Sequence, residues 1–427
     1  MEFKNIKHNK WAYRDIIGQD PLLGIFKSSR INFNNFVSGK KLSGKFKNLT
    51  LKKDAPNVII IICDALRDDH ISLNDYHRKT TPFLDSLSEK LCNFYNSPFH
   101  TSSCTSTFCG VISTLYGVNF EELSSTNLGI HDLLHYYSYK LSFILSGSHR
   151  SYYNLTDYYG KHIDNYFESK DIKYISPKIP ASSDRTLLAY LNSTQFKYDK
   201  NEKQFMYFHV MAPHEISFKE NIVYSVGNKN SKSDLINDYD NGVIQADNIL
   251  RDLYYNLKNK GLLENSMLII TSDHGQALNQ TKNFLHYGHG FWPIAETINI
   301  PLLIIDRQNN YRNDYSTKID LYPTITDRCF ENPEIINMLL PGISLLKKSP
   351  TSRKTFHLGE LRNYGEPSVS IIESSNGIPL YKYLFNPSDK KAYLFDLKAS
   401  KGEEMMIQND SILNILKNDH HNYLKMK

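Results

Sequence analysis

The sequence predicts an α/β fold: a central mixed, mostly parallel β-sheet flanked by helices, followed by a small C-terminal antiparallel α+β subdomain. Unbroken apolar runs at Asn57–Cys63 and at 267–271 leave no side chain for solvent, which is typical of strands buried on both faces. A helical repeat of apolar residues over 238–263 precedes the second run. After residue 345 the pattern changes to short alternating strands at 368–372, 380–385 and 392–397.

The remaining elements follow from local signals. Residues 205–212 and 298–305 are apolar and predict two further core strands. Pro82 at a first helical position, with Thr81 as its N-cap, predicts a helix after the first strand. Another packing helix is expected to begin at Asp320.

Acidic residues stand at the ends of both apolar runs. Asp64 follows the first run, and Asp273 with His274 follows the second. Ligands of open α/β sheets bind at the carboxyl ends of the strands, so these three side chains are expected to hold one divalent ion. Two carboxylates and one imidazole favour Zn²⁺ or Mn²⁺ over Ca²⁺ or Mg²⁺. For Asp64 alone, capping of the next helix is the alternative.

Composition excludes several classes of protein. The formal charge of +5 is spread over 427 residues with acids and bases interspersed, so we expect no nucleic-acid partner. No apolar run approaches the roughly 20 residues of a membrane span, and the first residues lack the apolar core of a signal peptide. We therefore expect a cytoplasmic protein, with peripheral membrane association left open. The five cysteines show no metal-type spacing and are expected to be unpaired.

A series of short motifs resembles the sulfatase branch of the alkaline phosphatase superfamily. In the family's order they are Asp64-Ala65-Leu66-Arg67, Asp69-His70, Thr80-Thr81-Pro82-Phe83-Leu84-Asp85, Pro213-His214, Ser272-Asp273-His274-Gly275, His289-Gly290 and Asp320-Leu321-Tyr322-Pro323-Thr324. The resemblance implies an alkaline-phosphatase-like sheet. Residues 1–55 are polar and basic and are expected to form an N-terminal extension, followed by a catalytic domain over 56–345 and a C-terminal subdomain over 346–427.

The resemblance further implies a nucleophile before a helix. Counting back from 113–117 puts Cys104 there, as nucleophile and metal ligand. Sulfatases convert such a cysteine to formylglycine within Cys-x-Pro-x-Arg, but Ser106 and Phe108 replace the Pro and Arg, so we expect an unmodified cysteine. A thiolate is favoured at a helix N-terminus beside a cation. Thr105 and Thr107 remain alternatives, as does a Ser/Thr-rich cap around a buried cysteine.

Histidines complete the predicted site. By the resemblance, His214 and His289 act on the bound ester, where imidazole donors stabilise negative charge in the transition state. His149, Asn154 and His286 are expected to contact substrate; the segment around Asn154 resembles the glycerol-phosphate contact of lipoteichoic-acid synthases, although Leu155 replaces its Arg.

Together these features predict a metal-dependent phosphoester or phosphodiester hydrolase, or a phospho-group transferase, working through a covalent intermediate. The substrate would be an ester of a small molecule, a glycan or a lipid head group. Two alternatives are a sulfate-ester hydrolase and a non-catalytic protein that binds a glycan or an anion.

Overall fold

The computed structural model describes residues 48–124, 127–152, 154–227, 231–307, 311–312, 315–359 and 367–425. Most of the expected extension over residues 1–55 falls outside this set, and the domain boundaries stay a prediction. The body considered below belongs to one compact unit, Lys45–Leu123 with Leu128–Lys427.

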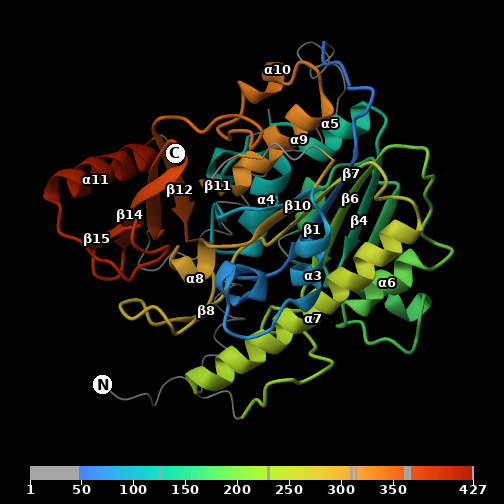
Figure 1. Ribbon diagram of the computed structural model, residues 1–427, viewed down its shortest axis with the longest axis horizontal. Coiled ribbons are helices and arrows are strands. Elements are labelled where there is room, and N and C mark those ends of the chain that lie inside the picture. The colour runs from blue at the N-terminus through green and yellow to red at the C-terminus, as the bar shows by residue number, and fades with distance from the viewer. Residues whose placement is uncertain are drawn as a thin grey trace. The chain divides into compact units, whose positions relative to one another are not determined.

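A seven-stranded sheet in the order β2-β10-β7-β1-β6-β4-β5 forms the centre of this unit (Figure 1). Its strands are β1 (Asn57–Cys63), β2 (Phe94–Asn96), β4 (Lys140–Leu145), β5 (Asn165–Glu168), β6 (Gln204–Val210), β7 (Ser266–Thr271) and β10 (Leu302–Ile305). Strand β1 runs parallel to β6 and β7, whereas β10 is antiparallel to β7 and β2. The predicted mixed, mostly parallel sheet is confirmed.

The register of the three middle strands positions the site. Ile62 in β1 is paired with His209 in β6 and with Thr271 in β7. Because the three strands are parallel, their carboxyl ends lie level at one edge of the sheet. The side chains from Val58 to Ile62 are at most 1% exposed, which agrees with a strand covered on both faces.

Helices cover both faces of the sheet (Figure 1). Helices α3, α6 and α7 share one apolar core with the sheet, while α4, α5 and α9 lie on its other face. The helices are α3 (Pro82–Lys90), α4 (Thr107–Tyr116), α5 (Ile130–Tyr136), α6 (Arg185–Leu191), α7 (Lys232–Asn259), α8 (Ala295–Ile298), α9 (Leu321–Cys329), α10 (Glu334–Asn337) and α11 (Asp410–Lys425).

A second, four-stranded antiparallel sheet follows near the C-terminus. Its strands are β12 (Arg353–Leu358), β13 (Val369–Ser375), β14 (Ile378–Asn386) and β15 (Lys391–Asp396). Leu416 and Tyr423 of α11 complete its apolar core. The predicted C-terminal antiparallel α+β arrangement is therefore confirmed, and β12 is an addition to the expected strands. Two small sheets pair β3 (Phe99–Thr101) with β11 (Tyr315–Thr317), and β8 (Ala277–Leu278) with β9 (Tyr287–Gly288).

Two local predictions need correction. Thr81 stands at the N-cap of α3, but its side chain makes no capping hydrogen bond. Asp247 of α7 caps the helix instead, accepting the N–H groups of Phe83 at 2.8 Å and Leu84 at 3.1 Å. A carboxylate satisfies these first-turn donors and interacts favourably with the helix dipole. The strand expected over 298–305 is also shorter, because α8 includes Ile298 and β10 begins at Leu302.

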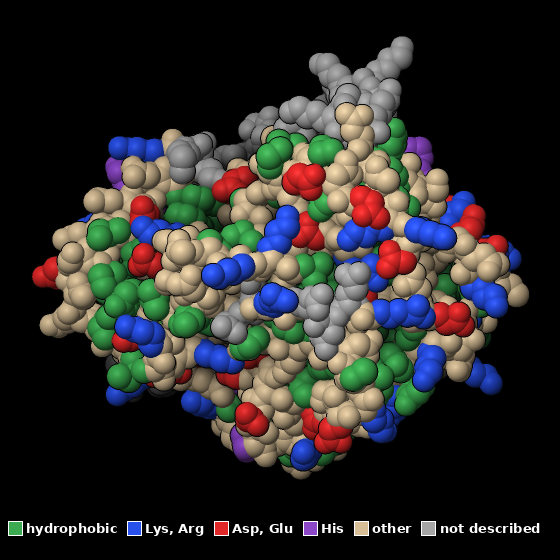
Figure 2. All heavy atoms as spheres, turned by 45° about the horizontal axis from the view of Figure 1, so that its top comes forward, with side chains coloured by type: hydrophobic (Ala, Val, Ile, Leu, Met, Phe, Trp, Pro, Cys, Tyr) green, Lys and Arg blue, Asp and Glu red, His purple; other side chains and the backbone are tan. Residues whose placement is uncertain are grey.

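Charged side chains are mixed over the surface. On the face drawn in Figure 2, Lys and Arg side chains lie among Asp and Glu side chains. Of the helices in the described parts of the chain, none combines the length and apolar character that crossing a bilayer requires.

Candidate active site

The carboxyl ends of β6, β1 and β7 supply the central side chains of the site. Asp64 follows β1 directly, and Asp273 and His274 lie just beyond β7. The chain turns sharply after Asp64, where Ala65 adopts a left-handed conformation with φ of 61°. The N–H of Ala65 then donates to Oδ1 of Asp273 at 3.1 Å, which ties the ends of the two strands together.

Asp64, Asp273 and His274 form a buried group of the kind that binds metal ions. One ligand atom from each lies within 4.8 Å of the others. Nε2 of His274 is 3.5 Å from Oδ1 of Asp64 and 3.7 Å from Oδ2 of Asp273. Among the described residues, neither of these two carboxylate oxygens has a hydrogen-bond partner. Buried oxygens without partners are costly unless a cation satisfies them.

The protonation states of these groups also fit a cation. Burial and the negative charge of Asp273 raise the pKa of Asp64 well above its ordinary value. Burial lowers the pKa of His274, so its imidazole is neutral. Its Nδ1–H donates to the carbonyl of Gly275 at 2.8 Å, which leaves the Nε2 lone pair facing the carboxylates. A divalent ion would offset the repulsion between the carboxylates and accept this lone pair, so the residues present fit such an ion.

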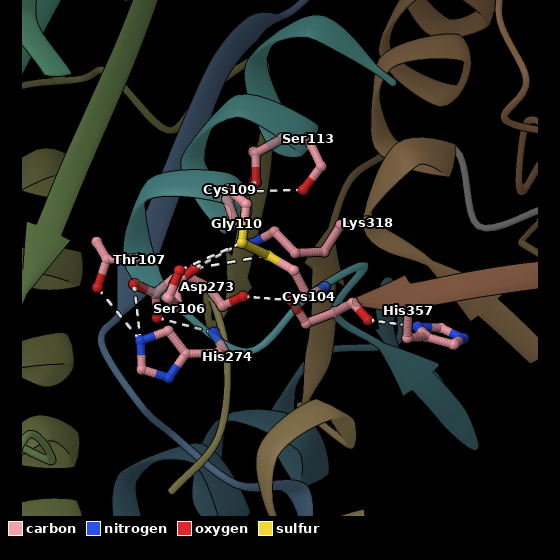
Figure 3. Close-up of a disulfide and its surroundings, with 12 residues drawn as sticks. Cys104, Ser106, Thr107, Cys109, Gly110, Ser113, Asp273, His274, Lys318 and His357 are labelled. Atoms are coloured by element: carbon pink, nitrogen blue, oxygen red, sulfur yellow. Dashed lines mark hydrogen bonds and ion pairs between the residues drawn. A yellow bond between two sulfur atoms is a disulfide. The ribbon is translucent and has the colours of Figure 1, made fainter. Parts of the chain in front are cut away.

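The hydroxyl of Thr107 lies against this group. Helix α4 begins at Thr107, and Oγ1 of Thr107 lies 3.2 Å from Nε2 of His274 (Figure 3). Gly110 lets the helix start approach, because a Cβ at this position would lie 2.5 Å from the carbonyl oxygen of Asp273. The positive end of the helix dipole therefore stands beside the carboxylates, with a hydroxyl group at its tip.

Cys104, the residue predicted as the nucleophile, is not a free thiol. Cys104 and Cys109 form a disulfide, on the side of the helix start away from the His274 ring (Figure 3). The expectation that the cysteines are unpaired is wrong for these two residues. A sulfur in a disulfide has no thiolate, so in this form Cys104 can neither attack an ester nor bind a metal. No sequence pattern indicates this disulfide, because it depends on how the loop before α4 folds.

Two further histidines lie next to His274. The ring of His289 stacks on that of His274 with centroids 4.3 Å apart, and His214 is 5.1 Å from His289. Burial, with a smaller effect of the neighbouring His274, lowers the pKa of His214 to about 3. The same two causes hold the pKa of His289 well below its usual range. Both imidazoles are therefore neutral near pH 7.

The two neutral imidazoles have opposite hydrogen-bonding roles. Nδ1 of His214 accepts the N–H of Ile216 at 3.2 Å, so its Nε2 carries the proton and can donate. Nδ1 of His289 donates to Oε1 of Gln276 at 3.0 Å, so its Nε2 carries a lone pair and can accept a proton. A hydrogen-bond donor and a base thus stand side by side.

The three expected substrate contacts lie at different places. His149 is buried near the site, with Nδ1 2.5 Å from the hydroxyl of Tyr159 and its ring edge-on to His209 at 4.6 Å. His286 rests against the rings of Phe291 and Trp292. Asn154 is exposed in a left-handed turn, and within the described residues it makes no hydrogen bond or ion pair with Asp64, Asp273 or His274. Their roles stay a prediction.

The family is established by sequence. The sequence model of the sulfatase family matches residues 56–329, and the chain belongs to this family. Members are hydrolases and transferases of phosphate or sulfate esters, so the chain is an enzyme of that class. A search among curated protein sequences finds no match.

Solved structures share the fold at low identity. The phosphonate monoester hydrolase of Agrobacterium radiobacter is similar at 15% identity and a TM-score of 0.60, over 87% of this chain and 95% of that one. The lipoteichoic acid synthase LtaP of Listeria monocytogenes gives 17% and 0.58, over 86% and 92%. The zinc complex of the periplasmic domain of EptC from Escherichia coli gives 17% and 0.56, over 71% and 91%. At these identities the likeness shows an alkaline-phosphatase-like fold.

Proposed function

We propose that the protein is a metal-dependent phosphoester or phosphodiester hydrolase, or a phospho-group transferase, with Thr107 as its nucleophile. The observation that carries this proposal is the position of the Thr107 hydroxyl at the start of α4, 3.2 Å from Nε2 of His274. Thr107 was an alternative to Cys104 on sequence grounds. The disulfide of Cys104 now favours the threonine.

Asp64, Asp273 and His274 would hold the divalent ion, with Zn²⁺ or Mn²⁺ preferred for their donor set. Such an ion, when bound, polarises the ester and favours the ionised form of the nucleophile. The α4 N-terminus adds to this effect, because its dipole stabilises negative charge on Thr107 and on the transferred group.

The chemistry then proceeds in two displacements at phosphorus. Oγ1 of Thr107 forms a bond to phosphorus as the bond to the ester oxygen breaks. Nε2 of His289 takes the hydroxyl proton and delivers it to the leaving oxygen, while Nε2–H of His214 donates to a non-bridging oxygen. Water or an alcohol next attacks the phosphothreonine, loses its proton to His289, and Thr107 recovers its own.

The residue types favour phosphate over sulfate esters. A sulfatase nucleophile is made by oxidising a cysteine to formylglycine, and a threonine cannot give this group. Cys104 lacks the Pro and Arg of the maturation signal and is bonded to Cys109. The neutral donor and base at His214 and His289 also favour turnover over the alternative of a non-catalytic binding protein.

The similar structures and the disulfide bear on the substrate class and on the location. The similar structures include a phosphonate monoester hydrolase and a lipoteichoic acid synthase, so an ester of a small molecule, a glycan or a lipid head group is the proposed substrate. Disulfides persist mainly in oxidising compartments. The Cys104–Cys109 bond therefore favours an extracytoplasmic location over the cytoplasmic one expected from the sequence.

A panel of p-nitrophenyl substrates tests this function. Phosphate monoester, phosphodiester, phosphonate and sulfate esters would be assayed with Zn²⁺, with Mn²⁺ and after chelation. We expect turnover of a phosphorus ester that is lost on chelation and restored by metal. Preferential turnover of the sulfate ester, or full activity in chelator, would contradict the proposal.

A further inference from the structure

His209 is a buried histidine that the proposed chemistry leaves without a role. It lies near the end of β6, and its side chain is 2% exposed. Nε2 of His209 is 3.8 Å from Oδ2 of Asp64 and 3.7 Å from Oδ2 of Asp273. Within the described chain, neither nitrogen of its ring makes a hydrogen bond.

The two aspartates face His209 and His274 alike. Asp64 turns Oδ1 towards Nε2 of His274 at 3.5 Å, and turns Oδ2 towards Nε2 of His209 at 3.8 Å. Oδ2 of Asp273 lies 3.7 Å from both Nε2 atoms. Each carboxylate therefore has an oxygen within 4 Å of each imidazole.

The distances from Nε2 of His209 to the carboxylate oxygens are too long for hydrogen bonds. They fit atoms that bind the same metal ion. An N–H···O bond spans roughly 2.7 to 3.2 Å between its heavy atoms. Two ligands held about 2 Å from one metal ion are separated by roughly 3 to 4 Å, depending on the angle between them. The distances from His209 to both carboxylates lie in that second range.

The other neighbours of His209 provide no hydrogen-bond partner for its ring nitrogens. His149 presents its ring edge-on at 4.6 Å, and its own Nδ1 is engaged by Tyr159. Tyr207, two residues earlier on the same face of β6, has a buried hydroxyl that also lacks a hydrogen bond among the described residues. A cation held by the carboxylates would accept the lone pair of a His209 ring nitrogen.

We propose that His209 is a further ligand, in addition to His274, of the ion held by Asp64 and Asp273. The proposal rests on the metal site of the proposed function. It changes the protein donor set from one imidazole to two, and a second imidazole strengthens the preference for Zn²⁺ or Mn²⁺ over Ca²⁺ and Mg²⁺.

X-ray absorption at the zinc edge tests the proposal without relying on activity. The full chain would be loaded with one equivalent of Zn²⁺, and the imidazole ligands counted from the extended fine structure. We expect two imidazoles in the wild-type protein and one in His209→Gln. Competition with a chromogenic chelator should show Zn²⁺ affinity at least tenfold weaker in His209→Gln.

His131→Gln is the matched control. His131 of α5 is equally buried, and both its ring nitrogens also lack hydrogen bonds within the described chain, but its ion-pair neighbour is Asp132. We expect this variant to keep two imidazoles and wild-type affinity, so a general effect of losing a buried histidine would be visible.

The outcomes separate the two proposals. Stoichiometric Zn²⁺ with one imidazole in the wild-type protein would overturn the role of His209 and leave the Asp64, Asp273 and His274 site intact. The number of imidazole ligands is measured on the wild-type protein, so this result does not depend on whether a variant folds. Unchanged ligation and affinity in a folded His209→Gln protein would overturn it equally. Failure of the wild-type protein to bind Zn²⁺ would overturn the metal site itself.

Discussion

The hydroxyl of Thr107 lies 3.2 Å from Nε2 of His274, although 167 residues separate the two in the chain. One residue begins a helix and the other follows the end of a buried strand. Their proximity joins a helix N-terminus, which stabilises negative charge, to a group of buried carboxylates that suits a cation. The proposed catalytic role of Thr107 depends on this relationship.

Replacing Thr107 with Ala should reduce kcat at least about a thousandfold, because no other hydroxyl would take over the attack. Thr107→Ser should keep a measurable part of the activity, since the oxygen remains. Steady-state kinetics on the best ester of the panel would measure both. Thr114→Ala is the matched control, because within the described residues the one hydrogen bond of that hydroxyl goes to the carbonyl of Gly110 in its own helix, at 2.8 Å. Near-normal turnover by Thr107→Ala would rule out its role as nucleophile.

His214 should act as a hydrogen-bond donor. His214→Ala should lower kcat/KM by about a hundredfold, the order expected for loss of a transition-state donor. His214→Gln should recover part of this loss, because its amide can donate from a similar place. The pKa of about 3 predicts that His214 stays neutral above about pH 4, so the pH profiles of wild type and His214→Gln should share their acidic limb. Equal loss in both variants, with equal loss of Tm, would indicate a structural role.

The disulfide should matter more for stability than for chemistry. Cys104→Ala/Cys109→Ala opens a short loop that contains Thr107, and the loop-closure estimate predicts a loss of about 2 kcal/mol in the free energy of unfolding. Activity should stay within about tenfold of wild type. Urea unfolding and kcat would measure the two effects. A folded double variant with no turnover would restore Cys104 as the candidate nucleophile.

Lys318 should make stability depend on pH. It is fully buried near the site, with Nζ 2.5 Å from the carbonyl of Ser272, and burial lowers its pKa from 10.5 to about 7, against the opposing effect of Asp273. Between these values the unfolded chain keeps the proton that the folded protein has released. The free energy of unfolding contributed by Lys318 therefore rises with pH over this interval.

The variant Lys318→Met removes this contribution. Urea unfolding of both metal-free proteins between pH 7 and about 9.5 would give the difference in stability. We expect the advantage of the variant to shrink as pH rises, because deprotonation relieves the burial of charge in the wild-type protein. Parallel curves for the two proteins would show that Lys318 keeps its proton throughout.

The fold could be predicted from the sequence because the apolar patterns in the sequence match the burial of the side chains in the structure. The run at β1 has no solvent face, and its side chains are buried as that pattern requires. The same reasoning predicted that Asp64, Asp273 and His274 would meet, since parallel strands bring their carboxyl ends to one edge. These features depend on local pattern together with one general property of parallel sheets.

Other features depend on contacts between distant segments. Asp247 caps α3 from a helix more than a hundred and sixty residues away, which no local signal at Thr81 indicates. The disulfide, and with it the proposed preference for Thr107 over Cys104, depends on how the loop before α4 folds, which counting back from residues 113–117 cannot show. His209 lies within an apolar strand, where a single histidine has no distinguishing pattern until the register sets it against two carboxylates.

Trapping the covalent intermediate tests the central proposal most directly. The metal-loaded enzyme would be mixed with an activated phosphorus ester, quenched in acid within one turnover, digested and sequenced by mass spectrometry. The account predicts one phosphoryl-containing adduct on Thr107, absent from Thr107→Ala and present in Thr114→Ala. An adduct on Cys104, Thr105 or any other residue, or turnover with a demonstrated direct attack of water and no adduct, would contradict it.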